Sequence, residues 1–400
     1  MYQFSNLKSF LNDLQHPHKI QVVGRWVVAG VEVDSPFPIS SGSVTVDLTA
    51  TYLRTCSVTI PAIAYRGTEV LKYVPAPQGG GSSLATPWGT EIKLYRSIVG
   101  IGGTTYPLIP LGVFRLAQVS IVDTQDGLTI SLNGYDRSYT VGIQLWTDTY
   151  HIAKGTNLNT AISDILEPRF PWHVTTNFPA TTATTSALTF GIDAAHNPWT
   201  VAWTLARAHG KQLYFDVTGQ LLMQDWPNPG GKSPVWTLTA SSTSALIDVT
   251  RNLSNTPLTG NATILPNHVI AFGESTSLKA PMRADAKITD PHNPLRVGGP
   301  YGDVPFIVTT NRVLTQAHLQ AYANTLLQQY TGQDEQIVLD CIENPALEVN
   351  DVIKIEREVS NTNGNYFVTG MVHSLEPETP MQVTCQRAVG YDGYSGNSTA

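Results

Sequence analysis

One stretch late in the chain constrains the fold more than any other: a strongly periodic helix that leads directly into short strands. Between residues 315 and 332 the apolar side chains recur at helical spacing. They are Leu319, Tyr322, Ala323, Leu326, Leu327 and Tyr330. Thr315 is placed to cap the start of this helix and Gly332 to end it. The Val- and Ile-rich runs that follow lie at 336–343, 351–359, 366–373 and 381–387. This order predicts a helix leading into a small antiparallel barrel, with its sharpest turn at 361–364.

The first third of the chain has the same pattern of short strands. Apolar or alternating runs lie at 21–34, 43–48, 52–60, 91–98, 112–122 and 128–133. Six strands of this length fit a small barrel or sandwich. This part of the chain contains a strand, a turn at Asp126-Gly127 and a second strand. The same order of strand, turn and strand recurs around Asn363-Gly364. The sequence therefore predicts two related barrels.

Helix signals separate the two groups of strands. Thr156 or Asn157 can cap a helix that Pro168 ends, and Asn197 can cap a second one that closes at Gly210. A short meander of strands follows, which predicts a small α+β domain. A short amphipathic helix is predicted over residues 4–15, and we favour an arm packed on its own domain over one that reaches a neighbouring subunit.

We therefore expect a mainly β chain with α+β parts: two small antiparallel β-barrel domains plus two smaller α+β domains. The expected division is an N-terminal arm (1–18), a first barrel (19–139) with a mobile loop (61–89), an α+β domain (140–235), a second barrel (236–279 with 333–388), an inserted domain with the helix (280–332) and a flexible tail (389–400). The Gly-rich centre of the loop, at 75–83, is the reason to expect mobility there.

Composition excludes several classes of function. The net charge of -7 argues against a nucleic-acid clamp, because phosphate binding needs a clustered surplus of Lys and Arg. No run of about 18 apolar residues is present, so we expect no membrane insertion by this chain, and no signal peptide is visible. Cys56, Cys341 and Cys385 have no metal-ligand spacing, which favours buried free thiols.

Catalytic patterns are also missing from the sequence. The ten histidines are scattered without a zinc-protease pair, and Gly231-Lys232-Ser233 lacks the first glycine of a phosphate loop because Trp226 stands there. The acidic residues that could form a carboxylate pair are Asp334, Glu335, Asp351, Glu356 and Glu358. They lie beside turns or at alternating strand positions, where acids keep the solvent face polar. We predict no catalytic, cofactor-binding or metal-binding residue, no cofactor and no enzymatic activity.

Several segments, taken in order, resemble the minor tail proteins of long-tailed phages that infect actinobacteria. The segments are 38–47 with Arg54, 89–96, 110–115, 134–138, 298–305 and 344–352. Together they span nearly the whole chain. At Asn350 this family commonly has glycine, and since asparagine tolerates the left-handed conformation we expect the turn to survive.

The resemblance implies a baseplate or tail-tip hub, with a fold shared by the hub part of contractile secretion spikes. Such hubs are homotrimers in which two barrels per chain give six quasi-equivalent units beneath a sixfold tail tube. The implied partners are tail tube and distal tail proteins, tip or fibre proteins, and the tape-measure protein in the lumen. Phage DNA would pass through without specific binding. The implied location is the distal end of the virion tail, after synthesis in the bacterial host cytoplasm.

The resemblance also predicts how the parts are arranged. The barrel strands should form the ring, the α+β domain and the insertion at 280–332 should lie outside it, and loop 61–89 should meet a neighbour or the tip. Two other functions stay open at this point. One is a cell-wall-degrading tail-tip enzyme that uses Glu356 and Asp334. The other is a carbohydrate-binding module in which Trp88, beside the Gly-rich loop, is the exposed aromatic platform.

Overall fold

The computed structural model describes residues 1–400 except 17, 62–73, 75–83, 126, 192–196, 240–244, 258–261, 274–280, 312–314, 378 and 388–400. The predicted mobile loop centre at 75–83 and the predicted flexible tail at 389–400 lie outside the described residues. Strands account for 44% of the structure and helices for 17%, which confirms the expected mainly β fold.

Most strands belong to one 13-stranded sheet that has two parts. The first β half consists of β1 (Lys19–Val28), β2 (Val31–Phe37), β3 (Ser41–Asp47), β4 (Arg54–Ile60), β5 (Glu91–Val99), β6 (Ile109–Thr124) and β7 (Gly127–Asp136). The second β half consists of β13 (Trp236–Thr239), β14 (Leu246–Leu253), β18 (Glu335–Cys341), β19 (Val352–Arg357), β20 (Thr362–Ser374) and β21 (Met381–Arg387). The strand order is β14-β18-β21-β20-β3-β4-β7-β6-β5-β1-β2, and β19 followed by β13 branches from β20.

Strand pairing leaves each half open between two strands that are consecutive in the chain. Among the described strands, β2 does not pair with β3, and β13 does not pair with β14. Antiparallel pairing of β3 with β20 joins the two halves instead. The prediction of two barrels thus anticipated the two groups of strands but not the sheet that unites them.

A single apolar core runs through both β halves. Trp26 and Phe114 from the first half share it with Leu339, Ile353 and Met371 from the second. The strands that enclose this core have the expected period of two, since the residues of β18 are alternately buried and partly exposed along its whole length. A shared core of this size makes the two halves one folding unit rather than two independent domains.

The expected single strand at 21–34 is two strands joined by a tight turn. Ala29 and Gly30 both have positive φ, at 51° and 79°, which is the geometry of a type I′ hairpin turn. Asparagine is the usual residue at the first of these positions and alanine is not, so the sequence signal for a turn is absent. A Cβ atom on Gly30 would lie 2.7 Å from the ring of Trp172, so this glycine also permits close packing.

The residues between the two β halves form a helical unit. It consists of α2 (Arg137–Gly142), α3 (Leu158–Leu166) and α4 (Pro198–Ala208) with the short strands β8 (Tyr150–Ile152), β9 (Thr176–Asn177), β10 (Leu188–Phe190), β11 (Lys211–Phe215) and β12 (Leu221–Asp225). The side chains of Asn157 and Asn197 accept hydrogen bonds from backbone N–H groups at the starts of α3 and α4, so both predicted caps are confirmed.

A second small unit, the outer unit, packs one helix on one sheet. It consists of α5 (Gln316–Tyr330), β15 (His268–Gly273), β16 (Met282–Lys287) and β17 (Pro305–Thr310). The Thr315 side chain caps α5, and Gly332 has a φ of 90°, as the sequence predicts. The placement of β15 in the second barrel (236–279) was wrong, because among the described strands β15 pairs with β16 and β17 alone. The alternating apolar residues Val269 and Ala271 of β15 would suit the sheet of the second β half as well as that of the outer unit.

The hairpin between β19 and β20 differs from the prediction by a few residues. The turn falls at 358–361, where Asn361 has a φ of 52° and its N–H donates to the carbonyl of Glu358 (2.9 Å). Asn363 and Gly364, the predicted turn pair, are already in β20 opposite Glu356 and Ile355. This Asn-Gly pair can lie within β20 because the opposite residues of β19 pair with it in the sheet.

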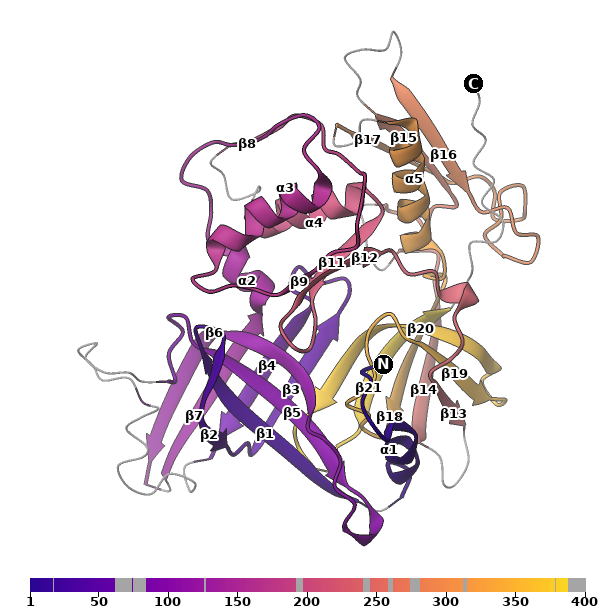
Figure 1. The fold of residues 1–400 in the computed structure, drawn as a ribbon. Coiled ribbons are helices and arrows are strands. Elements are labelled where there is room, and N and C mark those ends of the chain that lie inside the picture. The colour runs from indigo at the N-terminus through magenta and orange to yellow at the C-terminus, as the bar shows by residue number, and fades with distance from the viewer. Residues whose placement is uncertain are drawn as a thin grey trace.

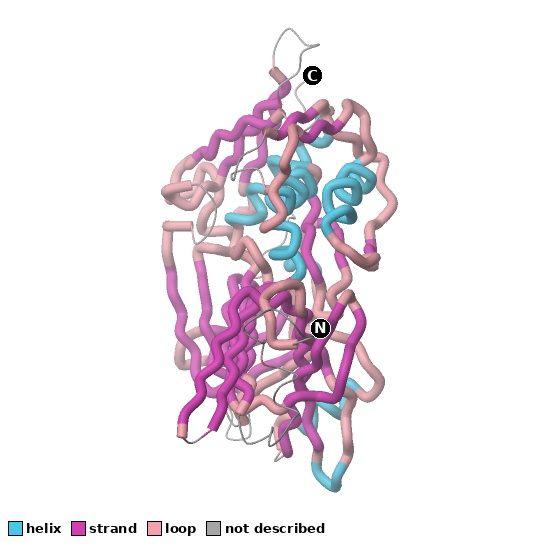
Figure 2. Tube along the Cα trace, turned by 90° about the vertical axis from the view of Figure 1, so that its left-hand side faces the viewer, coloured by secondary structure: helices cyan, strands magenta, loops and turns pink. Residues whose placement is uncertain are grey.

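The predicted N-terminal helix is present as α1 (Leu7–Asp13), and it packs on its own chain. Phe10 and Leu14 are buried against Ile98 and Ile109 of the first β half and Ala346 of the second. Figures 1 and 2 show α2 to α5 gathered at one end of the molecule, over the strands of the large sheet, while α1 lies among the strands.

Candidate assembly surface

The pairing of β3 with β20, here called the seam, holds the two β halves together. Its register runs from Gly370 opposite Asp47 to Ser374 opposite Ser43. One further backbone hydrogen bond extends the seam at each end. At one of these ends, the N–H of Leu48 donates to the carbonyl of Thr369 (3.0 Å). Non-local pairing of this length, together with the shared core, fixes the relative orientation of the halves.

A buried polar cluster lies beside the seam. His373 Nδ1 is 2.6 Å from Glu343 Oε1, and the N–H of Ser374 donates to Glu343 Oε2 (3.2 Å). Arg96 of β5 donates from Nη1 to the carbonyl of Ser374, which ties the first β half to the second. Burial lowers the pKa of Arg96, and the charge of Glu343 opposes that shift. Each buried charge here has a partner, which is the condition for such groups to be tolerated.

Two ion pairs add further links between the halves. Arg54, which is almost fully buried on β4, pairs with Glu348 of the loop before β19. The terminal amino group of Met1 pairs with Asp351. Asn350, between these two acidic residues, has a φ of 72°, so asparagine supports the left-handed turn that was expected to survive at this position.

The helical unit is attached to the first β half through a buried ion pair. Arg137 at the start of α2 donates from Nη2 and Nε to the carboxylate of Glu91 on β5, at 2.8 and 3.0 Å. Its Nη1 donates to the carbonyl of Gly219, which belongs to the β11–β12 turn (2.8 Å). Two hydrogen bonds from one guanidinium to one carboxylate restrain the relative orientation of the two groups as well as the distance between them.

The free edges of the large sheet are the surfaces most suited to assembly. Among the described strands, β2 pairs only with β1, β14 only with β18, and β13 only with β19, and we consider β2 and β14 further. Six of the eight residues of β14 are exposed, including Ile247 at 53% and Leu253 at 68%. An exposed edge with apolar side chains offers N–H and C=O groups to a strand of another chain.

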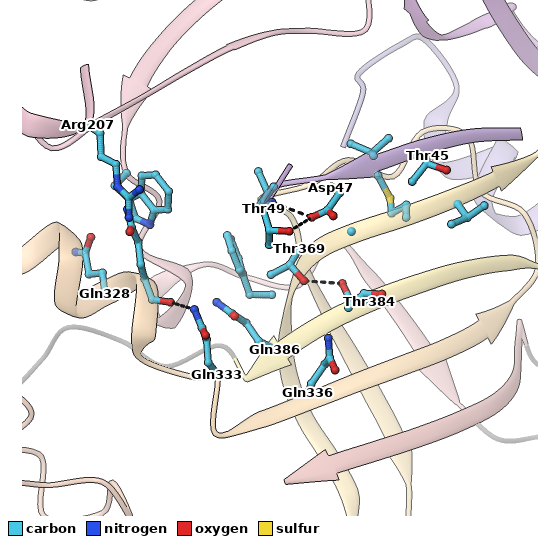
Figure 3. Close-up of a pocket in the computed structure, with 18 of the residues that line it drawn as sticks. Thr45, Asp47, Thr49, Arg207, Gln328, Gln333, Gln336, Thr369, Thr384 and Gln386 are labelled. Atoms are coloured by element: carbon cyan, nitrogen blue, oxygen red, sulfur yellow. Dashed lines mark hydrogen bonds between the residues drawn. The ribbon is translucent and has the colours of Figure 1, made fainter. Parts of the chain in front are cut away.

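A groove of about 440 Å³ lies where the seam meets the last turns of α4 and α5, and we call it the three-way groove (Figure 3). Its wall on the helix side is formed by Trp203, Arg207, Trp226, Gln328, Gln329 and Gln333, and its wall on the sheet side includes Thr45, Asp47, Thr49, Thr369, Thr384 and Gln386. Figure 3 shows Arg207 and Gln328 on the helix side of the gap and Thr369 and Thr384 on the strands opposite. Sequence reasoning missed this site because its residues come from distant parts of the chain.

Four of the five acidic residues considered for catalysis, all except Glu358, are held in separate ion pairs. Asp334 pairs with Arg387, Glu335 with Arg251, Asp351 with the terminal amino group, and Glu356 with Lys354. They come from different strands and loops and do not line the three-way groove. The geometry therefore does not bring the carboxylates of Glu356 and Asp334 together in one cleft.

Histidine, cysteine and tryptophan side chains were the other candidates for sites. In the part of the chain that the structure describes, no three or more His, Cys, Asp or Glu side chains are grouped to hold a metal ion. All three cysteines are buried and free, as predicted. Trp88 is largely exposed, as predicted. Lys232, which was considered as part of a phosphate loop, donates to the carbonyl of Asn350.

None of the described helices is long and apolar enough to cross a membrane.

Known proteins resemble this chain in structure but not in sequence. No family model and no curated protein matches it. The 43 kDa tail protein of prophage MuSo2 from Shewanella oneidensis has 13% identity and a TM-score of 0.58, over 92% of this chain and 98% of that one. A tail protein from Neisseria meningitidis MC58 has 12% identity and a TM-score of 0.61, over 92% and 96%.

A secretion-system protein has the same architecture. This component of the E. coli type VI secretion system, described as similar in structure to the T4 tail proteins gp27 and gp5, has 11% identity and a TM-score of 0.50, over 95% of this chain and 80% of that one. The chain thus has the fold of phage tail proteins, which confirms the predicted fold class, and a secretion-system component is similar to it in fold. The assignment to phages that infect actinobacteria stays a prediction.

Proposed function

We propose that this chain is the structural hub of a phage tail tip, a homotrimer that forms a pseudo-hexameric ring at the distal end of the virion tail. The observation that carries the proposal is the two-part sheet with a free edge on each half. Three copies would place six β halves around a channel. Three seams within chains would then alternate with three contacts between chains, made by the free edges β2 and β14.

The other parts of the chain suit the roles of such a hub. The ring would continue or close the tail tube and contact tail tube and distal tail proteins, with the tape-measure protein in its lumen. The helical unit and the outer unit would lie outside the ring and carry tip or fibre proteins. A net charge of -7 would let DNA pass during ejection without specific binding. This work is done by interfaces, so we propose a non-enzymatic role.

The trimer contact can be tested on the purified chain with substitutions on β14. Burying Ile247 and Leu253 contributes about 2 kcal/mol for each side chain, so lysine at both positions should weaken each contact by about a thousandfold. Light scattering should give a trimer for the wild type and a monomer for the I247K/L253K variant, with unchanged circular dichroism. The matched control is I307K on β17, because Ile307 is 62% exposed but belongs to the outer unit.

Two results would contradict this assembly. The first is a wild-type chain that stays monomeric both alone and with its distal tail protein. The second is an I247K/L253K variant that forms trimers as well as the I307K variant does. The second result would reject the contact through β14 while leaving the tail location to be tested on the virion.

A further inference from the structure

The three-way groove contains a cation, Arg207, that has no ion-pair partner among the described residues. Arg207 stacks on the ring of Trp203, with its guanidinium carbon 5.0 Å from the ring centroid. Within the described residues, no carboxylate oxygen comes within 4.0 Å of Arg207, and its buried Nε has no acceptor. Burial lowers the pKa of this guanidinium, which nevertheless stays charged because arginine starts from a pKa above 12. A partly buried and unpaired charge costs stability, so it is best explained by something that it binds.

Two amide atoms of glutamines that line the same groove are also unpartnered. Gln328 Oε1 and Gln329 Nε2 are both buried, and neither has a hydrogen-bond partner in the described structure. One is an acceptor and the other a donor, so together they match a hydroxyl group, which both donates and accepts. Counting Arg207 Nε, three buried polar atoms without a partner in the described structure line this one groove.

The sheet side of the groove adds hydroxyl groups and one carboxylate. Thr45, Thr369 and Thr384 come from neighbouring strands of the seam and its flank. Asp47 accepts two hydrogen bonds from Thr49 through one oxygen, Oδ1. A carboxylate on this wall repels a bare anion but accepts hydrogen bonds from hydroxyl groups. The groove therefore suits a ligand that is acidic at one end and hydroxylated elsewhere.

We propose that the three-way groove binds a hydroxylated ligand with one acidic group, which is the chemistry of a uronic acid or a sugar phosphate. The acidic group would pair with Arg207, and the hydroxyl groups would bond to the amides of Gln328 and Gln329 and to Asp47. The partly exposed indole of Trp226 supplies an apolar face for a sugar ring. The volume of about 440 Å³ lies within the usual range for small-molecule sites. This binding activity goes beyond the hub function and does not depend on it.

Titration calorimetry of the full-length chain tests the proposal with four probes: glucuronate, glucose 6-phosphate, glucose and inorganic phosphate. We expect saturable binding of at least one acidic sugar, with glucose and phosphate each weaker by at least about tenfold. The stronger of the two acidic sugars identifies the source of the acidic group. The R207M variant should bind that sugar at least about tenfold more weakly, because the charged hydrogen bonds are lost.

Thermal stability separates a binding role of Arg207 from a structural one. Removing an unpaired buried charge should leave the Tm of R207M equal to or above that of the wild type. The matched control is R169M, because Arg169 also stacks on an indole, 5.3 Å from the ring centroid of Trp146, but donates to the backbone carbonyls of Ile165 and Gln144. R169M should lower the Tm and leave sugar binding unchanged.

Three results would overturn the proposal. One is the absence of saturable binding of either acidic sugar in the millimolar range. Another is equal binding of inorganic phosphate and the acidic sugars, which would make the groove an unspecific anion site. The third is an R207M variant that unfolds or loses stability, which would make Arg207 a structural residue. None of these results bears on trimer formation, so failure here is distinguishable from failure of the proposed hub function.

Discussion

Acid should destabilise the contact between α4 and α5 through one buried histidine. His209, directly after α4, is 7% exposed, and both of its ring nitrogens lack hydrogen-bond partners in the described structure. Its ring lies edge-on to that of His318 of α5, with the centroids 5.2 Å apart. Burial, followed by repulsion from His318 and Lys211, lowers the pKa of His209 from 6.5 to about 4. The neutral form is therefore the one that the fold accommodates.

The size and sign of the effect follow from proton linkage. Between pH 6.5 and about 4 the unfolded chain binds the His209 proton and the folded chain does not, so stability falls as the pH falls. A pKa difference of about 2.5, at about 1.36 kcal/mol for each pH unit, amounts to about 3 kcal/mol at pH 4. Above about pH 6.5 the contribution should be constant.

Urea unfolding at about pH 7.5 and about pH 4 measures this contribution. The H209F variant should lose about 3 kcal/mol less stability between the two pH values than the wild type does. The control is H151F, because His151 is exposed on β8, and this variant should lose as much as the wild type. Equal losses for the wild type and H209F would refute the assignment of this acid sensitivity to His209.

Three further substitutions test the attachments between units. The R137M variant leaves Glu91 buried without its partner, so its free energy of unfolding in urea should fall by about 3–5 kcal/mol, and E91L/R137M should recover most of this loss. The N350A variant should be less stable than N350G by about 1 kcal/mol in thermal unfolding, because only alanine strains the left-handed backbone, while both lose the hydrogen bond to Gln212. The free energy of unfolding of the N197A variant should fall by about 1 kcal/mol because the helix cap is missing, and the N197S variant should retain most of this stability.

The elements that the sequence predicts well are those whose signals are local. Helix caps act within three residues, so Thr315 and Asn197 could be identified without knowledge of the fold, and the cap of α3 could be narrowed to Thr156 or Asn157. The periodic apolar positions of α5 are likewise a property of one short segment. Asn350 shows the same principle for a turn, because its tolerance of positive φ belongs to the residue itself.

Strand partners could not be predicted in the same way. The pattern of β15 fits any two-layer packing, so nothing in residues 268–273 shows that this strand joins the outer unit rather than the second β half. The seam pairs Ser43 with Ser374, more than 300 residues later in the chain, and small polar residues carry no pairing code. The β1–β2 turn was missed because Ala29 adopts a conformation that alanine rarely takes.

The three-way groove was missed for a related reason. Arg207 on α4 and Gln328 on α5 look like ordinary solvent-exposed helix residues in the sequence. Only the folded chain brings the ends of both helices and the seam around one space and leaves these polar atoms without partners in the described structure. Unpaired buried polar atoms are visible only in three dimensions, so a site of this kind has no sequence motif.

Electron cryomicroscopy of the intact virion tests the central claim most directly. The account predicts three copies of this chain at the distal end of the tail, with six β halves around the channel and the helical and outer units on the outside. Contacts within and between chains should alternate around that ring. Density for this chain elsewhere in the particle, or a ring built from only one β half of each copy, would contradict the account.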